Sequence, residues 1–587
     1  MLDLGAEVNR VKWVLVLVLV VMVPAPVGSD SSQTSSSLRF PLHTSHTSPV
    51  TGAVTLSADP PLKPGLIGVQ FKLDGYVLEA LVPAPPYRVL WSAASTTNGE
   101  HTVAAEARYA SGVVIEAAPL TFTVANPETF NRVYYVDAIA GNDSVDGLHP
   151  GTAWKTITKA NSSVMAGDTV LLRGTFPGQY IRPTVPGTAA KPITFKSYPG
   201  ETAVLVSGRY GAAVWLPSLS YVIVEGIAIR QVGSDAVPIT SGSHHVVLRR
   251  CDLRDGPAIK ITSANDNVIE FNTIADVGRE AANAGDAIWV ANGSSRNRIL
   301  YNTLRNAGHA LIGIGGDRAG DADVLDNVVA HNDLSNPWAL PLGLTWKARR
   351  TLVEHNTMHD GGTSPTTRAM SRSGIQVYAS ENTIRYNVVS NNAWAGLELA
   401  AYTYATSITQ DAIGNQIYHN VVYGNGAWGL VLAEKNGRKV RDNLIANNVF
   451  LDNGGYTYSG RVYTIGIDQY HNPTAWPVGS LEGNQIRNNV FRRRRGFAGE
   501  TLVLRIRNPR HGDNLDYTLT KFEETYPEAR DNLEVDPLFT DEVKHDFTLQ
   551  ARSPAMGRGM IIPGVPYKGS APDIGAFPSP RSPRNSR

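Results

Sequence analysis

Apolar and polar residues alternate along the second half of this chain, and Asn or Gly interrupts the alternation at regular points. One fragment returns eight times: an aliphatic residue, two variable positions, an Asn, one variable position and a second apolar residue. The copies centre on Asn272, Asn302, Asn332, Asn356, Asn387, Asn420, Asn448 and Asn489, and a ninth carries Cys251 in place of the Asn. Centres that lie 21 to 41 residues apart predict one structural unit stacked many times, with loops of different length between the copies.

The period of the pattern predicts strands, because apolar positions recur at every second residue and no stretch here sustains a helical stripe. A recurring Asn suits an inward corner, where its amide can hydrogen-bond to the turn backbone and to the same amide about 4.8 Å away in the next coil. Asn also tolerates the left-handed backbone that tight corners require. The pattern predicts a β solenoid.

These repeats resemble those of right-handed parallel β-helix proteins, the architecture of pectate lyases, chondroitinase B-like and alginate lyases, polygalacturonases and mannuronan epimerases. The resemblance covers residues 133–577. It implies an all-β chain: a right-handed parallel β-helix with an N-terminal cap. A short amphipathic helix that ends near Val164 is expected to cover the first coil, which would otherwise leave an unpaired edge.

The residues before the repeats divide into three segments. Residues 1–28 hold a short basic region and an apolar run, Trp13–Val23, that is too short to span a bilayer comfortably. They are predicted to be a signal peptide, with an uncleaved N-terminal anchor as the alternative, so the protein is predicted to be secreted or at the cell surface. Residues 29–49 are Ser/Thr-rich and are predicted to be a flexible linker. Residues 50–126 alternate in short strands, which predicts an immunoglobulin-like β-sandwich.

Two fragments of that sandwich, Val69–Gly75 and Asn98–Val103, are similar to segments of bacterial immunoglobulin-like domains in secreted carbohydrate-active proteins. The resemblance implies a spacer or attachment module, with carbohydrate binding as the alternative. At the other end of the chain, residues 578–587 are predicted to be a disordered tail.

Charge and cysteine content narrow the classes of partner. Lys plus Arg number 53 and Asp plus Glu 52, so no global field favours nucleic acid or an anionic membrane. We expect no nucleic-acid partner and no membrane contact beyond the N-terminal anchor. The one basic run, Arg492–Arg495, is predicted to be a solvated loop. Cys251 is the single cysteine, and its ladder position predicts a buried structural thiol.

A second strand follows each Asn motif, and aligning these strands gives two columns of outward-facing residues. One column reads Trp289, Gly313, Thr345, Gln376, Glu398, Val431, Gly466, Arg505, and its neighbour reads Ala291, Gly315, Lys347, Tyr378, Ala400, Ala433, Asp468, Arg507. Polar groups gather at the middle coils, which predicts a site rather than a uniformly solvated face. The candidate catalytic residues are Lys347, Arg349, Tyr378 and Glu398, and the candidate substrate-binding residues are Trp289, Gln376, Tyr402 and Asp468.

In the polysaccharide lyases that the chain resembles, this face is the sugar-binding groove. The resemblance therefore implies a polysaccharide partner that contains uronic acid, and β-elimination as the reaction. The enzyme must neutralise the sugar carboxylate, remove the adjacent proton and protonate the leaving oxygen. By the resemblance, Lys347 or Arg349 would perform the first two tasks and Tyr378 would be the acid.

Three other functions stay open. A glycoside hydrolase needs two carboxyl groups about 5 Å or about 6.5–9.5 Å apart, and Glu398 with Glu434 is a pair on successive coils. The polygalacturonase signature is absent, since its nearest fragments, Gly285–Asp286 and Gly308–Ala310, depart from it. A C5-epimerase on the same fold and a non-catalytic surface or adhesion protein are the remaining alternatives.

The metal and cofactor are unknown from the sequence, with calcium as one candidate. Two acidic clusters could supply oxygen ligands, with Asx turns as the alternative: Asp137, Asn142, Asp143, Asp146 and Asp317, Asp321, Asp323, Asp326. His331, His355, Tyr386 and His419 each precede a ladder Asn and are expected to share a column. Stacked rings are favoured there over a zinc site.

Overall fold

The computed structural model describes residues 39–51, 53–78, 81–93, 99–125, 131–207, 211–231, 235–256, 259–278, 285–316, 320–363, 372–405, 408–434, 438–454, 463–469, 481, 483–492, 502–507 and 514–577. The predicted signal peptide or anchor, the first part of the predicted linker and the predicted tail lie outside these residues. In the described ranges, no helix has the length and apolar character needed to cross a membrane. Contacts divide the chain into two compact units, with the division near Val124.

The N-terminal unit consists of two antiparallel sheets, as an immunoglobulin-like sandwich requires. One sheet has the order β1-β2-β5 and the other the order β4-β3-β6-β7, with β8 also paired to β6. The strands are β1 (Leu42–Thr44), β2 (Ala53–Ala58), β3 (Leu66–Leu73), β4 (Tyr76–Val77), β5 (Arg88–Ser92), β6 (Gly99–Tyr109), β7 (Val114–Glu116) and β8 (Leu120–Val124). Alternate positions such as Val69, Phe71 and Phe122 are buried between them.

Strand β1 lies inside the segment predicted to be a flexible linker, so that prediction is wrong for residues 40–49. Leu42 pairs with Ala58 of β2, and Phe40 and Leu42 are both buried. The Ser/Thr content of the segment hid this alternation of large apolar residues, which is enough to build an edge strand.

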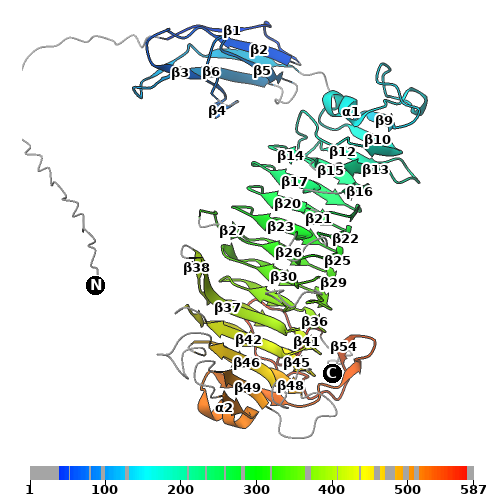
Figure 1. The fold of residues 1–587 in the computed structure, drawn as a ribbon, viewed down its shortest axis with the longest axis vertical. Helices are drawn as coiled ribbons and strands as arrows, with labels where there is room; N and C mark the ends of the chain where they lie inside the picture. The colour runs from blue at the N-terminus through cyan, green and yellow to red at the C-terminus, as the bar shows by residue number, and fades with distance from the viewer. Residues whose placement is uncertain are drawn as a thin grey trace, which may run out of the picture. The chain divides into compact units, whose positions relative to one another are not determined.

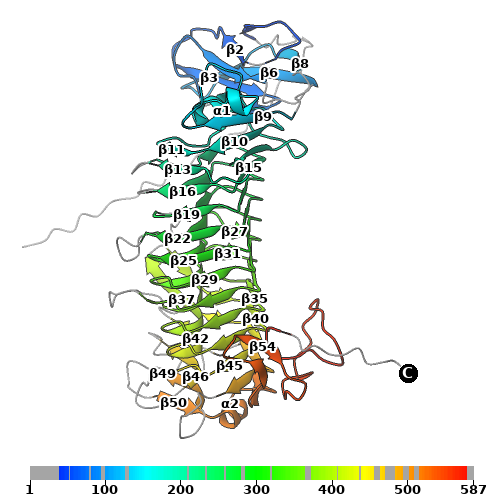
Figure 2. The same cartoon turned by 90° about the vertical axis from the view of Figure 1, so that its right-hand side faces the viewer.

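The C-terminal unit is a coil of strands that forms three long parallel sheets, which we name sheets I, II and III (Figures 1 and 2). Sheet I contains β9 (Val133–Asp137), β10 (Thr169–Arg173), β12 (Ile193–Ser197), β15 (Val222–Glu225), β18 (Val247–Arg249), β21 (Val268–Glu270), β24 (Arg298–Leu300), β28 (Val328–Ala330), β32 (Leu352–Glu354), β35 (Thr383–Arg385), β40 (Gln416–Tyr418), β44 (Leu444–Ala446), β47 (Gln485–Arg487) and β51 (Ala529–Arg530). Sheet II contains β11 (Thr175–Pro177), β13 (Val204–Ser207), β16 (Ala228–Gln231), β19 (Asp252–Arg254), β22 (Thr273–Val277), β25 (Thr303–Ala307), β29 (Asp333–Ser335), β33 (Thr357–His359), β36 (Val388–Ser390), β41 (Val421–Tyr423), β45 (Val449–Leu451), β48 (Val490–Arg492) and β52 (Leu533–Glu534).

Sheet III carries the strands that were predicted to hold the site. It contains β14 (Leu216–Pro217), β17 (Val237–Thr240), β20 (Ile259–Thr262), β23 (Ile288–Ala291), β26 (Ala310–Ile314), β30 (Leu340–Leu344), β34 (Ile375–Val377), β37 (Ala395–Ala405), β42 (Trp428–Glu434), β46 (Tyr463–Gln469), β49 (Leu502–Arg507) and, antiparallel to β49, β50 (Asn514–Tyr517). Strand β37 runs past its neighbours and folds back as a hairpin with β38 (Ile408–Gln410), which projects from the edge of the sheet in Figure 1.

The smaller elements lie at corners and ends. Two short pairs follow sheet III, namely β27 (Val324–Leu325) with β31 (Ala348–Arg349) and β39 (Ala412–Ile413) with β43 (Val440–Arg441), and the last pair is β53 (Phe539–Asp541) with β54 (Asp546–Leu549). The helices are a 3-10 turn, η2 (Pro150–Thr152), α1 (Ile157–Ser163) and α2 (Leu519–Thr525). Helix α1 matches the predicted cap: its C-cap is Val164, and Ile157 and Ala160 are buried in the core of the first coil.

The recurring Asn forms the predicted ladder at the corner between sheets I and II. Each side-chain amide donates to the amide oxygen of the next coil, at 2.9 to 3.1 Å, from Asn272 to Asn532. The ladder therefore runs one coil further than the repeat pattern. The pattern missed Asn532 because Ala529 stands where the other copies have Ile or Val, and Glu534 stands where they have an apolar residue. Cys251 occupies the same position and is buried, and burial raises the pKa of its thiol to about 12, so it is a structural residue.

Two further Asn ladders escaped the sequence pattern. One runs between sheets III and I, through Asn267, Asn297, Asn327 and again through Asn382, Asn415, Asn443 and Asn484. Another joins Asn392, Asn425 and Asn453 between sheets II and III. All of these amides are buried and bonded, and Thr351 stands at the ladder position between Asn327 and Asn382.

The residue before each Asn of the first ladder has a positive φ, which turns its side chain outward at the corner. Six of these residues are aromatic or His, and they stack with ring centroids 4.6 to 5.3 Å apart: Phe271, Tyr301, His331, His355, Tyr386 and His419. The predicted stacking of His331, His355, Tyr386 and His419 is confirmed. We call this the ring column.

The last described segment, residues 535–577, folds back over the outside of the coil. Phe539, Phe547 and Ile574 pack with Val421 and Val449 of sheet II. Arg492, predicted to lie in a solvated loop, instead bonds Asp452, Asp536 and Glu542, and only 9% of its side chain is exposed. That prediction is wrong for Arg492, and residues 493–495 lie outside the described residues.

Candidate active site on the outer face of sheet III

The register of sheet III gives the outward column that centres on Glu398. Pairing runs from Trp289 to Gly313, Gly343, Gln376, Glu398 and Val431 along neighbouring strands. The sequence alignment placed Thr345 where the structure places Gly343, an error of two residues. The alignment counted this strand from Gly343, whereas β30 begins three residues earlier, at Leu340, so Gly343 rather than Thr345 is the residue opposite Gln376.

Glu398 is the centre of a polar cluster that three predicted residues share. Its carboxylate accepts hydrogen bonds from the Tyr378 hydroxyl at 3.1 Å and from the Gln376 amide at 3.2 Å. The Gln376 amide also donates to the Tyr378 hydroxyl at 2.5 Å. Ser373, which the sequence reasoning missed, donates to the same carboxylate at 2.7 Å. The carboxylate is thus held in one orientation by donors from the neighbouring strand and the residues beside it.

The cluster is partly buried and has aromatic neighbours. Ser373 and Gln376 are buried, whereas Tyr378 and Glu398 are partly exposed. Trp394 and Trp428 pack with Tyr378 around the small residues Ala395, Ala400, Val431 and Ala433 of β37 and β42. Ser373, Trp394 and Trp428 lie a few residues before the positions that the sequence alignment compared. Columns that started a few residues earlier in the sequence would have included them.

Lys347 and Arg349 make ion pairs with acidic residues outside this cluster. Lys347 lies beyond the end of β30, and its ammonium is 3.3 Å from Asp323. Arg349 belongs to β31 and pairs with Glu381 and with Asp323. The bridge between Arg349 and Ser380 places Lys347 and Tyr378 each two residues before a paired position, as the alignment had them, so the catalytic role of the two cations stays a prediction.

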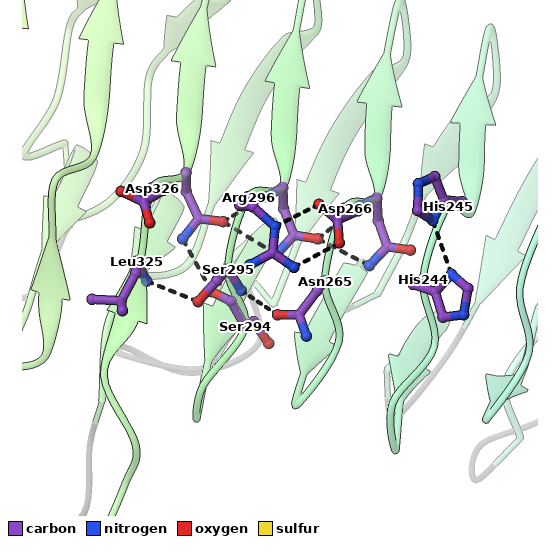
Figure 3. A network of polar contacts seen from close by, with 12 residues as sticks. His244, His245, Asn265, Asp266, Ser294, Ser295, Arg296, Leu325 and Asp326 are labelled. Atoms are coloured by element: carbon purple, nitrogen blue, oxygen red, sulfur yellow. Dashed lines mark hydrogen bonds and ion pairs between the residues drawn. The ribbon is translucent and has the colours of Figure 1, made fainter.

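Both cations lie at the corner between sheets III and I, beside a column of alternating charges. Figure 3 shows its first members: Arg296 donates two hydrogen bonds to Asp266, at 2.7 and 2.8 Å, and Asp326 follows on the next coil. Arg350 continues the column by binding Asp326 at 2.7 Å. All of these pairs are substantially exposed, so they align neighbouring coils more than they stabilise the fold.

The pair of carboxylates that the hydrolase hypothesis requires does not form. Glu434 pairs in register with Ala401, three positions beyond Glu398 on the neighbouring strand. Ala401 belongs to the buried core, and Glu434 is itself 1% exposed with its carboxylate accepting from the Val440 amide. Because successive residues of a strand face opposite sides, Glu398 and Glu434 are on different faces of sheet III.

A second polar group lies on the same face of sheet III, toward the N-terminal coils. His309 Nδ1 is 2.7 Å from Asp286 Oδ1, and the Ala310 amide donates to the same oxygen at 3.0 Å. Burial by itself lowers the pKa of His309, but the hydrogen bond to Asp286 and the charge of Asp286 outweigh it, so the net shift is upward. The sequence analysis noted both residues only in fragments that depart from the polygalacturonase signature, and it did not pair them.

The remaining predicted substrate-binding residues are placed by backbone register. Trp289 lies on β23, four strands from Glu398 in sheet III. Tyr402 belongs to the extension of β37 and pairs with Gln410 of the hairpin, and Asp468 pairs with Ala433. The side chains of Tyr402 and Asp468 lie outside what the structure describes.

The described members of the two acidic clusters bond to groups of the protein itself. Asp137, Asn142 and Asp146 accept hydrogen bonds from backbone amides two residues later, as Asx turns do, and Asp143 accepts from the backbone amides of Lys155 and Thr156. Asp323 and Asp326 pair with Lys347 and Arg350, and Asp317 is outside the described residues. Among the residues described, no three His, Cys, Asp or Glu side chains gather in a way that would hold a metal ion. Calcium stays a candidate from the sequence alone.

Comparison with known proteins supports the fold. A family model described as a right-handed β-helix region matches residues 202–336, in the middle of the coil. The C-terminal unit is a right-handed parallel β-helix. The resemblance inferred from the repeats, and the fold that it implied, are confirmed.

The relatives are distant. An uncharacterized protein of Bacillus subtilis strain 168, YwoF, is 24% identical over 482 residues, which cover 74% of this chain and 94% of YwoF. The α-1,3-galactosidase A of Akkermansia muciniphila is 36% identical over 75 residues, or 12% of each chain. Among solved structures, XylC with xylose has a TM-score of 0.45 at 12% identity and covers 63% of this chain and 86% of XylC. Pectate lyase Pel9A has a TM-score of 0.43 at 15% identity and covers 77% of this chain and 97% of Pel9A.

Proposed function

We propose that the protein binds a polysaccharide on the outer face of sheet III and cleaves it by β-elimination at Glu398. The observation that carries the proposal is the Glu398 cluster. A partly exposed carboxylate fixed by three side-chain donors, with two tryptophans packed nearby, is held in one orientation in which it can meet a ligand. The segment shared with an α-1,3-galactosidase supports a sugar as that ligand.

The geometry gives Glu398 and Tyr378 complementary roles. Glu398 would take the proton next to the carboxyl group of a uronic acid, and the Tyr378 hydroxyl would give its proton to the leaving glycosidic oxygen. A carbon–carbon double bond forms while the carbon–oxygen bond breaks. The hydrogen bond between Tyr378 and Glu398 would then return the proton from carboxyl to phenolate, which restores both groups.

This assignment differs from the role that the resemblance gave to Lys347 and Arg349, since both pair with acidic residues at the corner. Hydrolysis is less well supported, because Asp286, the other carboxylate noted on this face, is four strand spacings or about 19 Å from Glu398. Non-catalytic glycan binding on a cell surface is the second candidate, and the separation of the two cations from Glu398 favours it over a lysine-based lyase.

Two variants and one control test the proposal. Purified protein is incubated with polygalacturonate, alginate and a neutral galactan, and the absorbance of unsaturated product is followed together with reducing ends. We expect both signals to rise with an acidic polymer and to fall roughly 100-fold or more in Glu398→Gln and Tyr378→Phe. Glu270→Gln, the same exchange on the outer face of sheet I, should leave both signals unchanged.

Other outcomes would refute parts of the proposal. Reducing ends without unsaturated product would indicate hydrolysis. Binding of a polymer with no product at all would favour the non-catalytic function. Equal rates in wild type and Glu398→Gln would remove Glu398 from the reaction.

A further inference from the structure

The contacts of Asp286 indicate a prepared binding group rather than a simple surface ion pair. Its side chain is only 13% exposed and already accepts from the Ala310 amide, so its carboxylate is anchored without His309. The His309 side chain is 40% exposed and is held by Nδ1, which directs the other ring nitrogen, Nε2, away from Asp286. A buried carboxylate that orients a more exposed imidazole leaves one strong hydrogen-bonding atom at a fixed place on the surface.

An aromatic ring completes the group. A Cβ atom on Gly313 would overlap the six-membered ring of Trp289 and would lie 2.9 Å from Asp286 Oδ2. The indole and the carboxylate therefore meet over the bare backbone of β26, on the strand that follows His309. A half-buried tryptophan beside a fixed hydrogen-bonding group has the two properties that a sugar ring requires, an apolar surface for its C–H face and a partner for its hydroxyl or carboxyl groups.

Trp289 and Glu398 occupy the same outward column of sheet III, separated by β26, β30 and β34. At the two nearer strands the column carries glycine, Gly313 and Gly343, so those positions add no side chain between the two groups. Four strand spacings correspond to about 19 Å, a span that only a chain of several sugar units can bridge.

We propose that Trp289, His309 and Asp286 form a second sugar subsite, which binds a distant unit of the same polysaccharide that reacts at Glu398. This inference rests on the proposed function. It predicts that the protein prefers long polymers over short oligosaccharides, because a short ligand cannot reach both groups.

Binding in native gels that contain polygalacturonate, alginate or galactan tests the subsite. The migration of the full chain is measured against polymer concentration for wild type, Trp289→Ala and His309→Gln. We expect roughly tenfold weaker retardation in each variant, the loss of about 1.4 kcal/mol that one aromatic contact or hydrogen bond supplies. Phe271→Ala and His331→Gln remove comparable side chains from the ring column on another corner and should migrate as wild type. His309→Gln is the more conservative change, so it keeps the test valid if Trp289→Ala does not fold.

The outcomes separate the two proposals. Unchanged retardation of both variants, or an equal loss in the ring-column controls, would overturn the subsite while Glu398 retains its proposed role. Loss of retardation with unchanged product formation from short oligosaccharides would support the subsite. A wild-type protein that neither binds nor cleaves any polymer would overturn both proposals.

Discussion

Each ladder asparagine satisfies backbone groups that no strand can reach. The Asn387 amide donates to Val353 and Arg385 carbonyls and to the Asn420 oxygen, and its own oxygen accepts the Asn356 backbone amide. Replacement by a residue without an amide leaves several of these groups buried and unbonded. The corner therefore cannot keep its buried polar groups bonded without the ladder.

Asn387→Ala should accordingly lower the free energy of unfolding by about 3 kcal/mol, the cost of leaving buried polar groups unpaired. Urea unfolding at neutral pH measures the change. Asn131→Ala, at an exposed position outside the ladders, is the matched control and should be nearly neutral. An equal effect in the two variants would show that the ladder is not responsible.

His419, the last residue of the ring column, makes the stability of the β-helix depend on pH. His419 is 4% exposed, and burial lowers its pKa from the ordinary 6.5 to about 4. Burial also lowers the pKa of His355. A histidine that stays neutral in the folded protein but is protonated in the unfolded chain contributes stability that is complete above pH 6.5. That contribution is lost as the pH falls from 6.5 toward 4.

We therefore expect His419 to contribute about 3 kcal/mol to the loss of stability between pH 7 and pH 4. His309 and His359, whose pKa values are raised, act in the opposite direction over part of this range. His419→Asn keeps a residue that tolerates the left-handed corner, as Asn447 does one coil later. Urea unfolding across this range should show a shallower dependence on pH in the variant, and an unchanged slope would contradict the assignment.

At the scale of strands, the sequence predicts the repeating unit well and its register less well. The Asn positions were readable because a corner requires that residue type, and the corners place sheets I and II. In sheet III, the alignment counted one strand from Gly343, although that strand begins at Leu340 and alternates through Leu342 and Leu344. The two-residue error is confined to this strand, because the bridge between Arg349 and Ser380 restores the predicted offset at the corner that follows.

The candidate site was predictable on the strands whose pairing the alignment kept. Gln376, Tyr378 and Glu398 lie on such strands, and the structure brings them together. Asp286 and His309 come from different coils, and their contact depends on how loops of unequal length return to sheet III. No local pattern encodes that return, so residue spacing alone could not pair them.

At the scale of the molecule, the described C-terminal segment covers surface that the coil itself leaves apolar. The outer side of sheet II carries Val388, Val421, Val449 and Val490, which pack against Phe539, Phe547 and Ile574. Such a row on a solvated face would favour association with other chains. The segment therefore protects the last coils, and its attachment decides how stable they are.

Arg492 is the main polar attachment of that segment. It joins Asp452 of the coil to Asp536 and Glu542 of the segment, at 2.6 to 2.9 Å. Arg492→Ala would leave three carboxylates close together without their cation, and removing one partner of a buried ion pair costs about 3–5 kcal/mol. We expect faster cleavage within residues 535–577 in limited proteolysis and a lower melting temperature. Arg350→Ala breaks the exposed pair with Asp326 and should change neither measurement. If Arg492→Ala resists protease as well as wild type does, apolar packing alone holds the segment.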